Sequence, residues 1–131
     1  HPGILPFNRG VDAFKRSVVK CWPVGITSHI IDENIDAGSI IRTYLLPIYP
    51  HDTLHDVFAR AFQEEINILA RTPEDLSLQS PLEKVDKKYR LYHTKISEQD
   101  EHNLESHFEK NIKDFIRMSQ LREIDSFGHT K

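Results

Sequence analysis

The sequence predicts an α/β fold with a mixed sheet, flanking helices and a further helix near the C-terminus. Short apolar runs separated by Gly and Pro fill the first third of the 131 residues, with one helical segment between them. Apolar residues then recur every three or four positions from Asp52 and again from Ser97. Because strand, helix, strand, strand and helix cannot alone make a well-covered parallel sheet, we expect upstream residues to complete it.

The composition indicates a soluble, cytoplasmic protein of ordinary size. The 17 Lys and Arg against 20 Asp and Glu give a net charge of -3, so we expect no nucleic-acid or membrane partner. The single cysteine, Cys21, excludes an internal disulfide and a cysteine-based zinc site, and we expect it to be a small buried side chain. No apolar run approaches the ~20 residues that cross a bilayer, and the first residues lack the basic-then-apolar layout of a signal peptide.

The first elements follow from local patterns. Residues 11–22 place apolar side chains at helical spacing between the stop signals Gly10 and Pro23, and the predicted inward residues are Val11, Phe14, Val18 and Val19. Residues 24–32 and 39–49 are short apolar runs, the first rich in β-branched residues, which predict two strands. Their closeness in sequence favours a hairpin or strand pair.

The second half predicts two helices joined by a polar connection. A helix begins after Asp52 or Thr53 as N-cap, and its predicted apolar face consists of Leu54, Val57, Phe58, Ala61, Phe62, Ile66 and Leu69. The chain turns polar after Thr72-Pro73, so residues 73–90 predict a connecting segment. A final helix begins at Ser97, where SEQD resembles a capping box, with Leu104, Phe108, Ile112 and Phe115 facing inward.

Two stretches carry residues suited to chemistry. HPGILPFNRG occupies residues 1–10, and GITSHIIDENIDAGSII occupies residues 25–41. Polar turns against apolar strands place side chains at strand ends, where α/β sheets bind ligands. His1 and Asp36 are the candidate pair, because a carboxylate beside an imidazole favours the protonated ring and supports proton transfer near neutral pH. Asp and Gly in the second stretch are equally compatible with a simple tight turn.

These stretches resemble two signatures of the 10-formyltetrahydrofolate-dependent formyltransferases. HPGILPFNRG is similar to the segment that reads Asn-x-His-x-x-x-Leu-Pro and then Gly. GITSHIIDENIDAGSII is similar to Gly-x-Thr-x-His, a short acidic loop with Asp-x-Gly, and an apolar strand. Both stand in the family's order, and the resemblance extends from residue 1 to about residue 70. It implies the later part of a Rossmann-like domain, with residues 1–95 as the C-terminal half of the catalytic domain and residues 96–131 as a helical tail.

The resemblance also implies a reaction and its residues. The family transfers a formyl group from 10-formyltetrahydrofolate to an amino group, as in glycinamide ribonucleotide, methionyl-tRNA and amino-sugar N-formyltransferases. The catalytic His corresponds to His1 and the catalytic Asp to Asp36, while the family's Asn would stand two places before His1. Asp36 would hold His1 protonated and relay a proton, and no metal is needed. The folate pocket would be lined by Asp32, Glu33, Asn34, Ile35 and Gly38.

The turn before the first predicted helix carries the residues expected to bind the acceptor. Asn8, Arg9 and Gly10 belong to the variant LPxNRG, which resembles amino-sugar formyltransferases, so we expect them to bind substrate. Arg9 is suited to an acceptor phosphate, because a guanidinium presents a fork of donors. The tail is too short, helical and acidic for the extra domain of the transfer-RNA enzymes. A nucleotide-linked amino sugar or glycinamide ribonucleotide remains as the small-molecule amine.

Other interpretations stay open. His29 lies within a predicted strand, where a structural or loop-bracing role is more common than catalysis. His51 and His55 are four apart, but we expect an exposed pair rather than a metal site. A copper site built on an N-terminal His1 with His29 is disfavoured by the single cysteine and the two strong helices. The chain could instead be a non-catalytic remnant that packs against a partner. We expect an upstream segment or a second copy along the sheet edge, and no activity from residues 1–131 alone.

Overall fold

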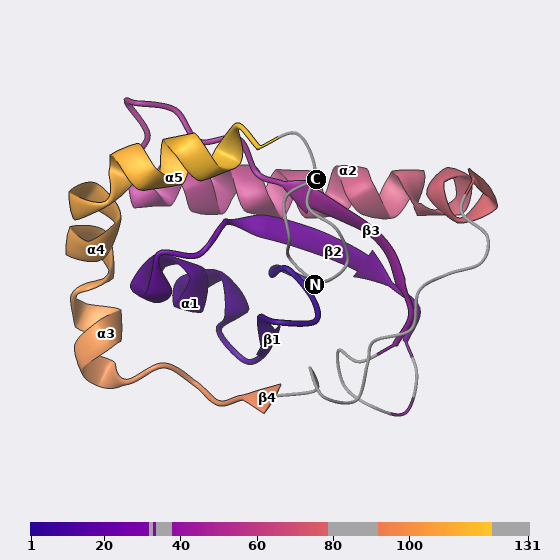
Figure 1. Ribbon diagram of the computed structural model, residues 1–131, viewed down its shortest axis with the longest axis horizontal. Coiled ribbons are helices and arrows are strands. Elements are labelled where there is room, and N and C mark those ends of the chain that lie inside the picture. The colour runs from indigo at the N-terminus through magenta and orange to yellow at the C-terminus, as the bar shows by residue number, and fades with distance from the viewer. Residues whose placement is uncertain (32, 34–37, 79–91, 122–131) are drawn as a thin grey trace.

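Two pairs of strands and five helices make up the described part of the chain. The computed structural model describes residues 1–31, 33, 38–78 and 92–121. The expected combination of strands and helices is confirmed (Figure 1). In chain order the elements are β1 (Arg9–Gly10), α1 (Ala13–Lys20), β2 (Gly25–His29), β3 (Ile40–Leu45), α2 (Leu54–Leu78), β4 (Tyr92–His93), α3 (Glu98–His102), α4 (Leu104–Lys110) and α5 (Ile112–Ser119).

The two strand pairs differ in direction. Strands β2 and β3 pair antiparallel, which confirms the expected strand pair, and their register shifts at the step from Ser28 to His29. Strands β1 and β4 pair parallel, with Arg9 opposite Tyr92 and Gly10 opposite His93. The sequence did not predict β4, because a strand of two residues is too short to carry an alternating pattern. Residues 92 and 93, which follow the expected connection, therefore pair with the end of the first stretch, residues 1–10, called the first motif below; residues 25–41 are called the second motif.

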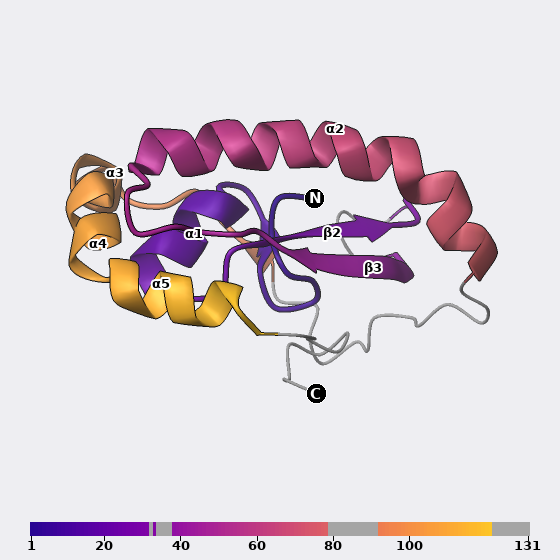
Figure 2. The ribbon, with the colours of Figure 1, turned by 90° about the horizontal axis from the view of Figure 1, so that it is seen from above.

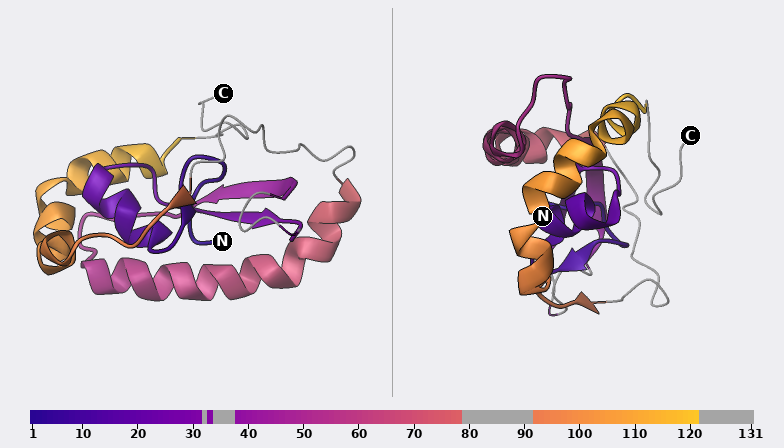
Figure 3. Two further views of the ribbon diagram at one scale, coloured as in Figure 1. Left: turned by 90° about the horizontal axis from the view of Figure 1, so that it is seen from below. Right: turned by 90° about the vertical axis from the view of Figure 1, so that its left-hand side faces the viewer.

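The core lies where α1, α2, α4 and α5 meet strand β2 and the segment that follows β3. Helix α2 runs along one side of the β2–β3 layer, whereas α1 and α5 lie beyond one end of the strands, with α1 between α2 and α5 (Figure 2). Helices α3 and α4 cover one end of the molecule and lead into α5 (Figure 3). The fully buried rings of Phe108 and Phe115 stack with centroids 5.6 Å apart. They share one apolar cluster with Val18 and Val57, so residues from α4 and α5 complete the core of the first half.

Helix α2 corrects two expectations. Its buried side chains are Leu54, Val57, Ala61, Ile68 and Asp75, whereas the expected inward residues Phe62, Ile66 and Leu69 are 68%, 50% and 74% exposed. A helix offers only one side to a sheet, and this side passes through Ile68 rather than through its neighbours Ile66 and Leu69. The helix also continues past Thr72-Pro73 to Leu78, so the expected end at residue 72 is wrong.

A polar clamp holds the last turns of α2 against β3. The Tyr44 hydroxyl donates to Asp75, and Arg42 donates to the other carboxylate oxygen at 3.1 Å. The guanidinium of Arg71 lies 5.3 Å from the Tyr44 ring centroid. Because a proline inside a helix costs ~3 kcal/mol or more, the helix needs such compensation to continue beyond Pro73.

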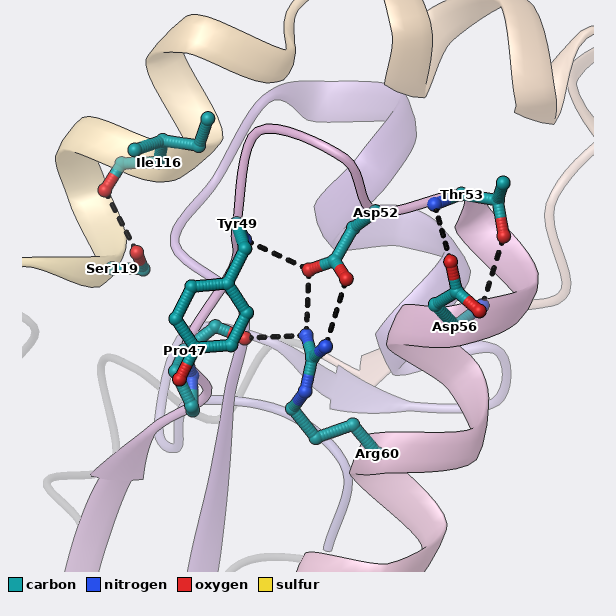
Figure 4. A network of polar contacts seen from close by, with 8 residues as sticks. All are labelled: Pro47, Tyr49, Asp52, Thr53, Asp56, Arg60, Ile116 and Ser119. Carbon is teal, nitrogen blue, oxygen red and sulfur yellow. Dashed lines mark hydrogen bonds and ion pairs between the residues drawn. The ribbon is translucent and has the colours of Figure 1, made fainter.

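The first turn of α2 is capped as its sequence predicts, with Thr53 as the N-cap residue (Figure 4). The main-chain nitrogen of Asp56 donates to Thr53 Oγ1 at 3.1 Å, and that of Thr53 donates to Asp56 Oδ2 at 2.8 Å. Arg60 binds both carboxylate oxygens of Asp52 at 2.7 and 2.8 Å, which lowers the pKa of Asp52. The entry to the helix is therefore held by two independent networks.

Three smaller expectations also change. The helix expected from Ser97 is divided into α3, α4 and α5, although Ser97 does cap it by accepting from the Asp100 nitrogen at 3.1 Å. One division falls at Asn111, whose side-chain amide donates to the carbonyl of His107 and so competes with the helix. Helix α1 begins at Ala13, so Val11 is 47% exposed rather than inward. Cys21 packs against the core but is only partly buried.

Candidate active site

One buried threonine places His1 at the edge of the β2–β3 layer. The main-chain nitrogen of His1 donates to Thr27 O at 3.0 Å, and the Thr27 nitrogen donates back to His1 O at 2.9 Å. The Thr27 hydroxyl donates to Gly3 O at 2.7 Å and accepts from the Leu5 nitrogen at 3.0 Å. Thr27 is fully buried, so the first five residues are tied to the interior of β2.

The imidazole of His1 is oriented by a main-chain carbonyl. Its Nε2 lies 2.7 Å from Asn8 O. Because a carbonyl oxygen only accepts hydrogen bonds, Nε2 carries a proton, and proton exchange by this ring falls to Nδ1. A methyl group at Gly3 would lie 2.8 Å from Asn8 O and 3.1 Å from His1 Nε2. The turn therefore requires glycine at position 3 to leave the ring in place.

The side chain of Asn8 faces away from this ring and into the interior. Asn8 is 2% exposed, and its amide nitrogen donates to Ala13 O at 2.6 Å and Ser17 Oγ at 2.8 Å. Its amide oxygen accepts from Arg16 at 3.3 Å. These contacts make Asn8 a brace between the first motif and α1. The expected substrate-binding role of Asn8 stays a prediction.

Arg16 is a buried cation that sequence reasoning missed. It is 5% exposed, and its second guanidinium nitrogen donates to the carbonyls of Val11, at 2.8 Å, and Thr94. Burial lowers the pKa of Arg16. Charged positions on a surface helix normally face solvent, so the helical pattern alone concealed this residue. Its contacts join α1, the turn before it and the segment after β4.

The second motif passes beside His1 at the end of β2. His29, at the end of β2, is partly buried, and its ring centroid lies 6.3 Å from that of His1 in an edge-on arrangement at 86°. The Ile30 nitrogen donates to Ser39 O at 2.8 Å, which closes the connection between β2 and β3 at its base. A strand irregularity at Ser28 and His29 accompanies this closure, as is common where a side chain is redirected next to a site.

The acidic part of this connection is described only in part. Asp36, Asp32, Asn34 and Ile35 lie outside the described residues, Glu33 is exposed and Gly38 is buried. The proximity of His1 and Asp36 therefore stays a prediction.

Among residues 1–31, 33, 38–78 and 92–121, no group of three His, Cys, Asp or Glu side chains is arranged to hold a metal ion. His51 and His55 are both exposed.

Arg9 and Gly10 meet β4 on the rim of the same turn. The Arg9 guanidinium carbon lies 5.4 Å from the centroid of the Tyr92 ring. Gly10 has a φ of +108°, and a methyl group there would collide with the carbonyl of His93. His93 in turn donates from Nε2 to Phe7 O at 3.1 Å. Within the described segments, no helix is long and apolar enough to cross a membrane.

Comparison with known sequences identifies relatives of the first half. The sequence model described as formyl transferase matches residues 1–72. Phosphoribosylglycinamide formyltransferase of Haemophilus influenzae is 32% identical over 69 residues, which are 52% of this chain and 32% of that protein. dTDP-4-amino-4,6-dideoxyglucose formyltransferase of Mycobacterium tuberculosis is 37% identical over 65 residues, 50% of this chain and 28% of that protein. The chain thus spans about a third of these relatives' length.

Comparison with solved structures extends the likeness beyond residue 72. The formyltransferase PseJ from Anoxybacillus kamchatkensis, in complex with UDP-4,6-dideoxy-4-formamido-L-AltNAc and tetrahydrofolate, matches with a TM-score of 0.62 and 27% identity. The match covers 92% of this chain and 64% of PseJ. A sugar N-formyltransferase from Shewanella sp. matches with a TM-score of 0.54 and 27% identity, covering 79% of this chain and 48% of that one.

Proposed function

The chain belongs to the formyl transferase family, and from this premise we propose that it carries part of a site that transfers a formyl group from 10-formyltetrahydrofolate to the amino group of a phosphate-bearing small molecule. The observation that carries the proposal is the placement of His1. Its ring is held by Asn8 O, its main chain is bonded to Thr27, and the His29 ring of the second stretch lies 6.3 Å away. Both family signatures therefore meet in space.

The folate site is proposed for the connection that follows β2. When bound, 10-formyltetrahydrofolate supplies an activated one-carbon group. We propose that the connection between β2 and β3 holds its pterin, through Asp32, Glu33, Asn34, Ile35 and Gly38. The support is that this connection is closed at its base by the bond from Ile30 to Ser39, next to His29, whose ring lies beside that of His1. The burial of Gly38 is compatible with a close approach of the ligand.

His1 and Asp36 take complementary roles in the proposed reaction. The acceptor's amino nitrogen forms a bond to the formyl carbon, while the bond from that carbon to the donor nitrogen breaks. His1, protonated at both ring nitrogens, stabilises the negative charge that develops on the formyl oxygen through Nδ1–H, because Nε2–H is bound to Asn8 O. Asp36 favours the charged ring, accepts the proton lost by the amine and passes it to the leaving nitrogen.

A nucleotide-linked amino sugar is the acceptor that we propose first. The matches to PseJ and to the Shewanella enzyme include residues beyond the segment that the family model covers. PseJ is bound to a UDP-linked formamido sugar, and the Shewanella protein is a sugar N-formyltransferase. Glycinamide ribonucleotide is the second candidate, supported by the Haemophilus influenzae relative. The motif LPFNRG favours the sugar.

We further propose the extent and setting of this unit. Residues 1–95 would form the C-terminal half of the catalytic domain, and residues 96–131 a helical tail packed on it. The shared core of Phe108, Phe115 and Val57 supports this packing. The single cysteine is compatible with a reducing cytoplasm.

The test is a formyl-transfer assay on the longest protein that contains this chain, with residues 1–131 assayed in parallel. 10-Formyltetrahydrofolate is mixed with a dTDP- or UDP-linked 4-amino-4,6-dideoxy sugar, or with glycinamide ribonucleotide. Tetrahydrofolate formation is followed by absorbance and the formylated product by mass spectrometry. Transfer to the amino sugar supports the proposal. Transfer to glycinamide ribonucleotide alone would support the formyl-transfer activity but identify glycinamide ribonucleotide, not the amino sugar, as the acceptor. Transfer to neither would refute the activity and favour a non-catalytic role.

A further inference from the structure

A segment beyond the family-model match is bound to the first motif. Strand β4, Tyr92–His93, pairs parallel with β1, Arg9–Gly10 (Figure 1). The Val11 nitrogen continues this pairing by donating to His93 O at 3.2 Å. The family model ends at residue 72, so this contact is made by a part of the chain that the family pattern does not describe.

The side chain of His93 also binds the first motif. Its Nε2 lies 3.1 Å from Phe7 O. Because a carbonyl oxygen only accepts hydrogen bonds, Nε2 of His93 is the donor in this contact. His93 is partly buried, and its ring centroid lies 6.2 Å from that of Trp22. The strand pairing and this ring contact together hold the imidazole where it reaches Phe7 O.

The hydrogen-bond acceptors of His93 and His1 are the carbonyls of two consecutive residues. His93 donates to Phe7 O, and Nε2 of His1 donates to Asn8 O at 2.7 Å. A peptide unit is planar, so the bond to Phe7 O also fixes the plane that contains the Asn8 nitrogen, which donates to Ile4 O at 3.0 Å. Only the φ and ψ rotations of Asn8 separate this plane from the carbonyl that holds His1. The position of His93 and the orientation of His1 are therefore linked through Asn8.

The side chain of Asn8 is connected to the same downstream segment. Buried Arg16 donates to Asn8 Oδ1 at 3.3 Å and also donates to Thr94 O. Gly10 has a φ of +108°, and a methyl group there would collide with the His93 main chain. The main chain and the side chain of Asn8 are thus both tied to residues that directly follow Tyr92.

We propose that His93 is a positioning residue for formyl transfer, because its hydrogen bond to Phe7 O keeps the Asn8 carbonyl where it orients the His1 ring. The inference rests on the proposed function, in which His1 stabilises the charge on the formyl oxygen. His93 itself touches no reacting atom. A displaced His1 ring stabilises the transition state less well, so the loss of this hydrogen bond acts on kcat more than on the binding of donor or acceptor.

Two substitutions at position 93 separate the hydrogen bond from the ring, in the longest protein that contains this chain. His93→Phe keeps a ring beside Trp22 but has no donor, and it is expected to lower kcat about tenfold with both KM values within about threefold of wild type. His93→Gln offers an amide N–H in place of the imidazole N–H and is expected to keep kcat within about threefold of wild type. His102→Phe, at an exposed histidine of α3, is the matched control and leaves kcat unchanged.

Nuclear magnetic resonance of protein with ¹⁵N-labelled histidine observes the His1 ring without catalysis. The signal that disappears in His1→Gln is assigned to His1. Wild-type protein is expected to show a hydrogen-bonded Nε2–H proton on this ring, because Nε2 donates to Asn8 O. In His93→Phe this proton should exchange with water about tenfold faster, whereas His93→Gln and His102→Phe leave its exchange unchanged. Circular dichroism checks that each variant is folded, and His93→Leu replaces His93→Phe if the latter is not.

Three results would overturn the inference: a kcat within about twofold of wild type in the variant without a donor, an equal loss of kcat in His93→Gln, or an unchanged Nε2–H signal of His1 in the variant without a donor. Absence of formyl transfer by the wild-type protein would instead refute the proposed function. The resonance measurement still decides in that case whether His93 holds the His1 ring in place.

Discussion

The main-chain carbonyl of Asn8 accepts a hydrogen bond from Nε2 of His1 at 2.7 Å, while the Asn8 side chain binds α1 through Ala13 O and Ser17 Oγ. One buried residue therefore links the orientation of the candidate catalytic ring to the position of the helix behind it. Because Nε2 donates to this carbonyl, any proton that the ring exchanges is carried by Nδ1. The following predictions test this arrangement and the fold that supports it.

Asp36→Asn is expected to lower kcat about a hundredfold or more while the thermal unfolding midpoint stays the same. An amide has the shape of the carboxylate but neither its charge nor its basicity, so His1 loses its charged partner. Steady-state assays and thermal unfolding of the longest protein that contains this chain measure both quantities. Near-normal turnover in this variant would contradict the proposed role of Asp36.

Gly3→Ala is expected to lower both activity and stability. The added methyl group would meet Asn8 O at 2.8 Å and His1 Nε2 at 3.1 Å, so either the carbonyl or the ring must move. The free energy of unfolding should fall by ~1–3 kcal/mol, and kcat by about tenfold, as the ring leaves its productive position. Urea unfolding and formyl-transfer assays measure the two effects. A loss of stability with kcat unchanged would show that this turn does not orient the catalytic ring.

Ile68→Ala and Ile66→Ala form a matched pair on α2. Ile68 is 4% exposed and faces the core, whereas Ile66 is 50% exposed. Ile68→Ala should lower the free energy of unfolding by ~2–4 kcal/mol, because it leaves a cavity. Ile66→Ala should change it by no more than ~0.5 kcal/mol. Urea denaturation of residues 1–131 checks both, and equal losses would mean that the buried side of the helix has been assigned wrongly.

Tyr44→Phe tests the clamp between β3 and the end of α2. The substitution removes the hydrogen bond to Asp75, a carboxylate that is 6% exposed, and should lower the free energy of unfolding by ~1–3 kcal/mol. Amide hydrogen exchange should rise in the turns of α2 that follow Pro73. Tyr49→Phe, at the exposed entry to α2, serves as the control for loss of a tyrosine hydroxyl. Unchanged exchange after Pro73 would exclude the clamp as the reason that the helix continues.

The pH dependence of this clamp follows from its two partners. Burial, and then the bond to Asp75, raise the pKa of Tyr44 to about 12, while the Tyr44 hydroxyl and Arg42 lower the pKa of Asp75. The stability contributed by Tyr44 is therefore complete below its ordinary pKa of about 10 and is lost as the pH rises toward 12. The stability contributed by the Asp75 carboxylate is complete above the ordinary pKa of an aspartate, about 4, and is lost as the pH falls through the lowered pKa of Asp75.

A spectroscopic titration of tyrosinate absorbance measures the Tyr44 part of this prediction. One of the four tyrosines should ionise near pH 12, and Asp75→Asn should move this step toward lower pH, because it removes the carboxylate that opposes ionisation. A titration in which all four tyrosines ionise together near pH 10 would contradict the shift.

Local patterns were sufficient where the physical cause is local. The caps at Thr53 and Ser97 depend on hydroxyl groups three residues from their partners, and both form as the sequence predicts. The two signatures that resemble a formyltransferase also lie within short stretches, and the family match over residues 1–72 confirms the family. These features could be predicted because interactions between near neighbours do not depend on the rest of the fold.

Only the tertiary structure decided which equivalent candidates face the interior. Ile66 and Ile68 have the same side chain, and the docking angle of α2 on β2 and β3 buries one and exposes the other. Arg16 is buried because the side-chain amide of Asn8 and the main-chain carbonyls of Val11 and Thr94 accept its hydrogen bonds, an arrangement that no helical pattern reports. Likewise, β4 meets β1 across more than eighty residues. The sequence by itself therefore determined the local elements and the family. The tertiary structure determined which residues lie beside His1 and Arg9, because burial and long-range pairing depend on many contacts that form together.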